Sequence, residues 1–190
     1  MLFRSESEAR ESDDVVVVLR GLRRFVPRRG RATWLLWIIS HPELVESDEP
    51  AQFDGVFAAS AHWARGQGEE FGVPVTPLLQ ATNPRRFTPA AAPADSGASR
   101  LFVGSTRTNY GPNRPILKAA IDRGCQPAVY GKGWSGLIDE RLIRGDYLPN
   151  GKVGKAYRSA GVVLNDHWEA MAREGFLSNR LFDEIESCRH

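Results

Sequence analysis

The densest cluster of functional groups is Asn165-Asp166-His167-Trp168, which follows the apolar run at 161–164. Such a run is typical of a buried strand. In open α/β sheets, ligands bind beyond the carboxyl ends of the strands, so binding groups are expected here. Shortly after, Glu174 precedes Ser178-Asn179-Arg180, which predicts a helix beginning at Ser178. Free N–H groups and a cation at a helix start can hold an anion, although an ordinary capped helix explains the same residues.

Asp183 follows in the same predicted helix, about one and a half turns after Ser178. A carboxylate there can accept hydrogen bonds from both hydroxyls of a ribose while the helix start holds phosphates. Glu184 is the competing carboxylate, about 100° of helix away, so the two cannot face one site equally. A solvated side chain is the alternative interpretation of Asp183.

Two other predicted strand ends carry groups suited to a nucleotide. Gly104-Ser105, with Arg107 nearby, follows the run at 101–103 and combines backbone N–H groups, a hydroxyl and a cation. A tight turn with a surface arginine is the simpler explanation. Tyr130-Gly131 ends the next run, and glycine allows close backbone approach to a ligand. Trp134 can stack on a base or cover the core, the more frequent role of a lone tryptophan.

The first half offers fewer candidates. His41 follows the apolar run at 33–39 and can bind a hydroxyl or transfer a proton, unless it is an ordinary loop histidine. Residues 20–31 are rich in arginine, a pattern that can bind nucleic acid. Acidic stretches on both sides and a net charge of +2 favour a solvated loop instead. Walker, zincin and serine-hydrolase motifs do not occur, and neither cysteine lies in a C-x-x-C, so no metal site is expected.

Strand and helix patterns alternate along the 190 residues, which predicts an α/β fold with two Rossmann-like lobes and mostly parallel sheets. A composition of 42% hydrophobic and 25% charged residues excludes a disordered polyelectrolyte. Residues 1–13 are predicted to be a disordered tail and 89–99 an interdomain linker, so the lobes are expected at 14–88 and 100–190. The β-branched run at 14–19 predicts a strand buried on both faces. Strands are also expected at 33–39, 55–59, 73–79, 101–103, 127–130 and 161–164, and helices from Ser60 and at 112–123, 152–160 and 178–187.

LNDHW at 164–168, EGF at 174–176 and SNRLFD at 178–183 together resemble the donor-binding half of GT-B fold glycosyltransferases of group 1. The similarity is greatest to bacterial members related to spore-maturation proteins. VYGKGW at 129–134 also resembles the donor-binding half of these enzymes, and LLWIISHPE at 35–43 resembles the preceding half. The resemblance implies sugar transfer from a nucleotide diphosphate sugar to an unidentified acceptor, without a metal or other cofactor. His41 is expected to be catalytic. The expected donor-binding residues are Gly104, Ser105, Arg107, Tyr130, Gly131, Asn165, Asp166, His167, Glu174, Ser178, Asn179, Arg180 and Asp183.

The sequence departs from that family at both ends. The opening strands of the acceptor lobe are missing, and the sequence ends directly after a predicted helix. We therefore expect a shortened chain, incomplete at both ends. Two alternatives stay open: a catalytically degenerate module that binds a nucleotide or sugar, and an α/β nucleic-acid-binding protein using loop 20–31. No apolar run approaches the roughly 20 residues of a membrane span. The charged N-terminus is not a secretory signal, so a cytoplasmic location is expected.

Overall fold

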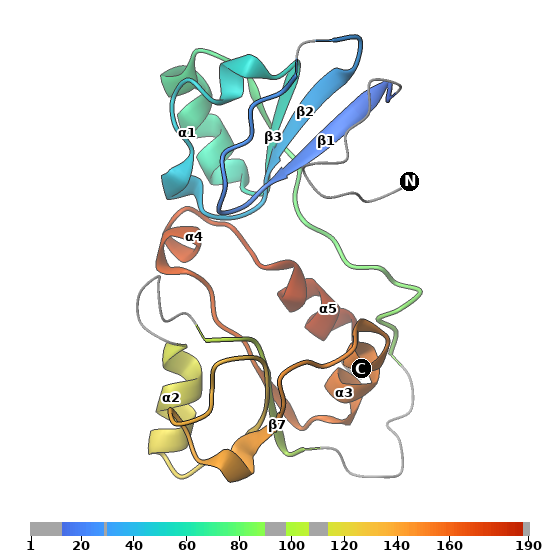
Figure 1. Ribbon diagram of the computed structural model, residues 1–190, viewed down its shortest axis with the longest axis vertical. Coiled ribbons are helices and arrows are strands. Elements are labelled where there is room, and N and C mark those ends of the chain that lie inside the picture. Colours follow the sequence, from blue (N-terminus) through green and yellow to red (C-terminus); the bar gives the residue numbers. More distant parts are fainter. Residues whose placement is uncertain (1–12, 29, 90–97, 107–113, 188–190) are drawn as a thin grey trace. The chain divides into compact units, whose positions relative to one another are not determined.

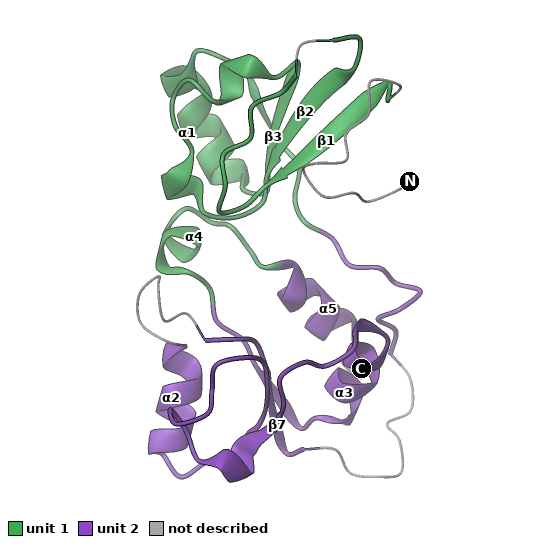
Figure 2. Ribbon diagram, viewed as in Figure 1, with its two compact units in different colours: residues 1–80, 167–178 green, residues 81–166, 179–190 purple. Residues whose placement is uncertain are grey.

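A computed structural model describes residues 13–28, 30–89, 98–106 and 114–187 (Figure 1). Nearly all of the predicted tail, most of the predicted linker, and Arg107 lie outside the described residues. The chain divides into two compact units, each built on its own four-stranded sheet (Figure 2). All strand pairs in both sheets are parallel, so the predicted α/β class with two Rossmann-like sheets is confirmed.

Unit 1 comprises residues 1–80 and 167–178. Its sheet has the order β1-β2-β3-β4. Ser60 caps α1, because its Oγ accepts the N–H of Trp63 at 3.1 Å. The helix ends at Gly72, in the left-handed conformation (φ 65°) that glycine adopts without strain. The elements are β1 (Val15–Arg20), β2 (Thr33–Ile38), η2 (Pro42–Leu44), η3 (Pro50–Gln52), β3 (Gly55–Ala58), α1 (Ala61–Phe71), β4 (Val75–Pro77) and, in the returning segment, α4 (Glu169–Arg173).

The strand at the start of the chain forms as predicted, but the prediction that it is buried on both faces is wrong. β1 is an edge strand whose only partner among the described strands is β2. Val15 and Val17 are 56% and 41% exposed, whereas Val16 and Val18 pack against the core. A run of uniformly apolar residues contains no alternation, so the sequence could not show which face is covered.

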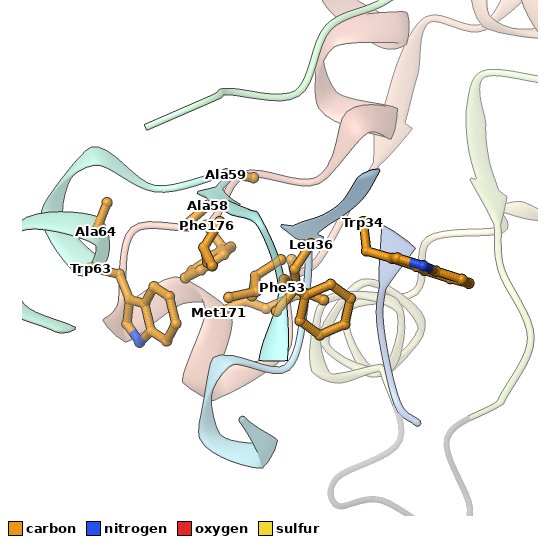
Figure 3. Packing of buried hydrophobic residues seen from close by; sticks show 11 residues of the cluster. Trp34, Leu36, Phe53, Ala58, Ala59, Trp63, Ala64, Met171 and Phe176 are labelled. Atoms are coloured by element: carbon orange, nitrogen blue, oxygen red, sulfur yellow. The ribbon is translucent and has the colours of Figure 1, made fainter. Parts of the chain in front are cut away.

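The core of unit 1 includes side chains from far along the chain. Met171 and Phe176, in the returning segment 167–178, are buried against the sheet and α1 (Figure 3). The Phe176 ring packs edge-on against Trp63, with centroids 5.7 Å apart. Segment 167–178 therefore belongs to unit 1, which corrects its predicted placement in the second lobe. Its apolar residues complete a core that the first 80 residues leave open.

Unit 2 comprises residues 81–166 and 179–190. The predicted boundary near 88 moves to 80, because Phe87 is buried with Leu101, Ala128 and Tyr157 of unit 2. The sheet order is β7-β6-β5-β8, and the β7 strand was not predicted. The elements are β5 (Arg100–Val103), α2 (Pro115–Asp122), β6 (Ala128–Tyr130), η4 (Glu140–Leu142), β7 (Ile143–Gly145), α3 (Asn150–Ser159), β8 (Val162–Leu164) and α5 (Asn179–Ser187).

Both faces of the unit 2 sheet are covered. Phe102 and Val129 pack with Leu117 of α2, whereas the neighbouring Leu101 packs in a second cluster with Tyr157 of α3. The chain moves from β5 to β6 and β7 on one side and returns with β8 on the other. Such a reversal of strand order leaves a crevice at the carboxyl ends of the strands, where open α/β sheets bind ligands.

Candidate functional site

A pocket of about 300 Å³ lies within unit 2. Its walls come from the ends of β5, β6 and β7, from α3 and from the first turns of α5. The pocket thus occupies the carboxyl ends of parallel strands, where the sequence predicts ligand-binding groups. The lining residues are Phe87, Val103, Gly104, Ser105, Tyr130, Gly131, Asp146, Tyr147, Leu148, Asn150, Val153, Tyr157, Asn179, Arg180 and Asp183.

The fold brings together predicted donor-binding residues from three regions that lie far apart in the sequence. Those that line the pocket are Gly104, Ser105, Tyr130, Gly131, Asn179, Arg180 and Asp183. Asp146, Tyr147, Asn150 and Tyr157 line it too, and sequence reasoning missed them. Asp146 and Tyr147 lie in the short connection from β7 to α3, and Asn150 begins α3, so recognition of β7 in the sequence would have placed all three just after a strand end.

Gly131 lets two strand-end loops approach each other. Its φ is 147°, and a Cβ at this position would overlap the carbonyl group of Gly104. The N–H of Gly104 donates to the Tyr130 carbonyl oxygen at 2.7 Å. Trp134 Nε1 donates to the Gly104 oxygen at 2.8 Å, and its ring is buried edge-on against Phe102. The core interpretation of Trp134 is therefore correct, and the glycine serves the contact between the loops.

Asp183 lies on the pocket wall formed by α5. Its Oδ1 accepts a hydrogen bond from Thr82 Oγ1 at 2.6 Å. Burial raises the pKa of the Asp183 carboxyl above its usual value, and the Thr82 hydroxyl and the charges of Arg86 and Arg180 partly offset this. Thr82 was not predicted as a site residue. The arrangement gives the pocket a carboxylate held in one direction beside the positively charged first turn of α5.

Glu184, the competing carboxylate, does not line the pocket. Its side chain is 7% exposed, and its Oε2 accepts a hydrogen bond from Asn165 Nδ2 at 3.2 Å. Burial raises the pKa of Glu184 to about 7. The structure therefore distinguishes the two neighbouring carboxylates by the direction in which α5 presents them, with Asp183 on the pocket wall.

Asn165 and Asp166, both predicted to bind donor, hold elements of unit 2 together instead of lining the pocket. Asn165 contacts Glu184 of α5. Asp166 Oδ1 lies 2.7 Å from Arg114 Nη1, and Arg114 Nε donates to the Ser105 carbonyl oxygen at 2.9 Å. Arg114 thus connects the loops after β5 and β8 across the crevice of the sheet. Its role was missed because nothing in its sequence context marks it.

The other predicted residues belong to unit 1. His167 Nε2 accepts the backbone N–H of Ser178 at 2.9 Å. The carbonyl oxygen of Glu174 accepts a hydrogen bond from Ser60 Oγ at 2.6 Å. His41 is buried in a left-handed conformation (φ 53°) at the end of β2. Its Nδ1 lies 3.2 Å from Glu43 Oε1, and its ring centroid lies 4.8 Å from that of Trp168.

Two arginines of the predicted basic loop are engaged by acidic groups of unit 1. Arg20 is 1% exposed and pairs through Nε with Glu49 Oε1 at 2.7 Å. Arg24 contacts Glu46 and Asp48 on the surface, and its guanidinium holds the pKa of the Asp48 carboxyl below its usual value. These pairs reduce the positive charge that the loop can offer to a nucleic acid.

Comparison of the chain with protein-family models, curated proteins and solved structures finds no match. Within the described residues, every helix is too short or too polar to cross a lipid bilayer. The described His, Cys, Asp and Glu side chains form no group of three or more that could hold a metal ion. The fold and the pocket together define an α/β protein with a polar pocket at the carboxyl ends of a parallel sheet.

Proposed function

We propose that the pocket of unit 2 binds a nucleotide diphosphate sugar and that the protein is a glycosyltransferase, which transfers the sugar to an acceptor hydroxyl. The observation that carries the proposal is that one helix, α5, supplies both a cation and a carboxylate to the same pocket. A nucleotide diphosphate needs both, since its phosphates are anionic and its ribose presents two O–H donors.

The diphosphate is assigned to the first turn of α5. Arg180 lines the pocket there, and the N–H groups of a helix's first turn have no partners within the helix. The helix dipole and the guanidinium both favour an anion at this position. As the bond between the sugar and the diphosphate breaks, negative charge grows on the leaving diphosphate. Groups already pointing at that charge lower the barrier of transfer.

The nucleoside is assigned to the rest of the pocket. Asp183 accepts the ribose hydroxyls, because an ionised carboxylate is an acceptor only and a ribose offers two donors. Tyr147, with 65% of its surface exposed, also lines the pocket and provides an aromatic face on which a base can stack. The sugar then projects from the diphosphate toward the mouth of the pocket.

His41 is the proposed catalytic group of unit 1. Glu43 lies on the Nδ1 side of its ring, and this favours the tautomer with the proton on Nδ1. Nε2 is then the nitrogen that can accept a proton from a hydroxyl.

A thermal-shift screen against UDP-glucose, GDP-mannose, ADP-glucose and dTDP-glucose tests the proposal. A bound donor stabilises the native state by about 2.7 kcal/mol at one hundred times its dissociation constant, so the melting temperature rises. Release of free nucleoside diphosphate then tests for turnover. Absence of a shift with all four sugars and with their parent nucleoside diphosphates would overturn the proposal.

Binding without transfer is the second candidate. It is favoured by one observation, that every residue lining the pocket lies in unit 2. A degenerate module of this kind would show a thermal shift with the donor but no release of nucleoside diphosphate. The same two measurements therefore separate the candidates.

A further inference from the structure

Glu184 is the most unusual ionisable group of unit 2. It is 93% buried on α5, the helix that carries the pocket residues Arg180 and Asp183, yet it does not itself line the pocket. Its hydrogen bond to Asn165 joins α5 to the residue that directly follows β8. Within the described residues, its second oxygen, Oε1, is buried without a hydrogen-bond partner.

We infer that Glu184 is a positioning residue for the nucleotide pocket: its hydrogen bond from Asn165 fixes the rotation of α5 so that Arg180 and Asp183 face the ligand. The inference rests on the proposed function for the identity of that ligand. It assigns to Glu184 no contact with the ligand.

The helix geometry explains why one anchor sets the direction of two pocket residues. Glu184 lies four positions after Arg180 and one after Asp183, so on α5 it shares a face with Arg180 and is turned about 100° from Asp183. A turn of α5 about its axis would move both side chains relative to the pocket. The bond from Asn165 opposes that turn from the sheet side.

The surroundings of Glu184 favour its neutral form. A buried carboxylate with an unpartnered oxygen pays a large desolvation cost, which a protonated carboxyl largely avoids. The charged and titratable groups that face it are Arg180 and Asp183 on α5 and Tyr157 on α3. Burial is the largest influence and raises the pKa of Glu184 to about 7, whereas the hydrogen bond from Asn165 and the charge of Arg180 favour ionisation and the charge of Asp183 opposes it. Ionisation above this pH leaves a buried charge whose Oε1 has no hydrogen-bond partner within the described residues, and we expect α5 to loosen so that this oxygen is hydrated.

The test measures pocket affinity at about pH 6 and about pH 8 with UDP-glucose and GDP-mannose. Their diphosphate diesters lack the second phosphate ionisation near pH 6, so a change in affinity reports on the protein. Glu184→Gln keeps a neutral, hydrogen-bonding side chain at both pH values. Glu186→Gln removes the same charge from the same helix and is the matched control. Hydrogen exchange of the α5 amides, measured without ligand, reports on the helix itself.

We expect wild-type affinity to fall at least fivefold between the two pH values and α5 exchange to accelerate. In Glu184→Gln both changes should vanish, with affinity close to that of the wild type at the lower pH, and Glu186→Gln should behave as wild type. Asn165→Leu should weaken binding and speed α5 exchange at both pH values. The inference is overturned if Glu184→Gln keeps the wild-type pH dependence, or if Glu186→Gln removes it equally. If neither sugar nucleotide binds at any pH, α5 exchange alone decides whether Glu184 positions the helix, and the screen with all four donors and their parent nucleoside diphosphates decides the proposed function.

Discussion

Nε2 of His167 accepts the backbone N–H of Ser178 at 2.9 Å, and these two residues are the first and last of the segment that returns to unit 1. The bond closes the segment into a loop at its base. Gln80 reinforces the closure, because its Nε2 donates to the carbonyl oxygens of Ile39 and Leu177, each at 3.0 Å. The loop is thereby held against the carboxyl end of β2.

The His167 bond predicts a local effect of mutation. His167→Ala removes the acceptor of the Ser178 N–H and should destabilise the base of the loop by about 1 kcal/mol. Limited proteolysis should then cut more readily within 167–178. His62→Ala, which changes an exposed histidine, is the control and should leave the cleavage rate unchanged.

Phe176 should be the main energetic contribution of the loop to unit 1. Its side chain is fully buried against Trp63, and Phe176→Ala should lower the free energy of unfolding by about 3–5 kcal/mol. Chemical denaturation followed by tryptophan fluorescence measures the loss. Leu177→Ala alters the adjacent side chain, which is 47% exposed, and a comparable loss there would contradict the assignment.

The buried pair of Arg20 and Glu49 should be sensitive to loss of one partner. Arg20 Nη2 also donates to the Leu44 carbonyl oxygen at 2.6 Å, so the guanidinium holds the loop after β2. Glu49→Gln leaves a buried cation without its counter-charge and should cost about 3–5 kcal/mol. The double variant Arg20→Met/Glu49→Leu should be less destabilised than Glu49→Gln, as thermal unfolding would show. A larger loss of stability in the double variant than in Glu49→Gln would mean that the hydrogen bonds of Arg20 contribute more stability than its unpaired buried charge costs.

The two pocket residues of α5 should contribute separately to donor binding. Arg180→Ala and Asp183→Asn should each weaken affinity for the sugar nucleotide that binds in the screen, by about 1–3 kcal/mol, through loss of a charge-assisted hydrogen bond. Isothermal titration calorimetry measures the change, and circular dichroism checks that the fold is retained. Unchanged affinity in Arg180→Ala would refute the anion site, and a larger loss in Glu184→Gln than in Asp183→Asn would assign the ribose to the other carboxylate.

Glu184 should also make stability depend on pH. Its pKa rises from the ordinary glutamate range in the unfolded chain to about 7 in the folded protein, so in this interval the folded state holds a proton that the unfolded state has released. Unfolding then releases a proton, and the free energy of unfolding falls as the pH rises from roughly 4.5 to 7. Urea denaturation across this pH interval should show that the free energy of unfolding falls less in Glu184→Gln than in the wild type. If the free energy of unfolding depended on pH equally in the two proteins, the proton released on unfolding would come from a group other than Glu184.

Local patterns in the sequence determined the elements of this protein. Apolar runs such as those at 33–39 and 161–164 became parallel strands, and the polar groups after 101–103 and 127–130 came to line one pocket. These inferences succeed because a buried strand needs a continuous apolar run and because parallel strands present their carboxyl ends at one edge of the sheet.

Core composition, the orientation of the α5 side chains and the exposure of β1 were decided only by the tertiary structure, because they depend on contacts between residues that are distant in the sequence. Phe176 completes the core of unit 1 although it lies more than 100 positions after Trp63, against which it packs. Asp183 and Glu184 have similar chemistry and adjacent positions, and only the rotation of α5, held through Asn165, sends the first to the pocket and the second to the interior. In the same way, the apolar run of β1 became half exposed because the core of unit 1 packs against only one face of the strand, which its own residues do not encode.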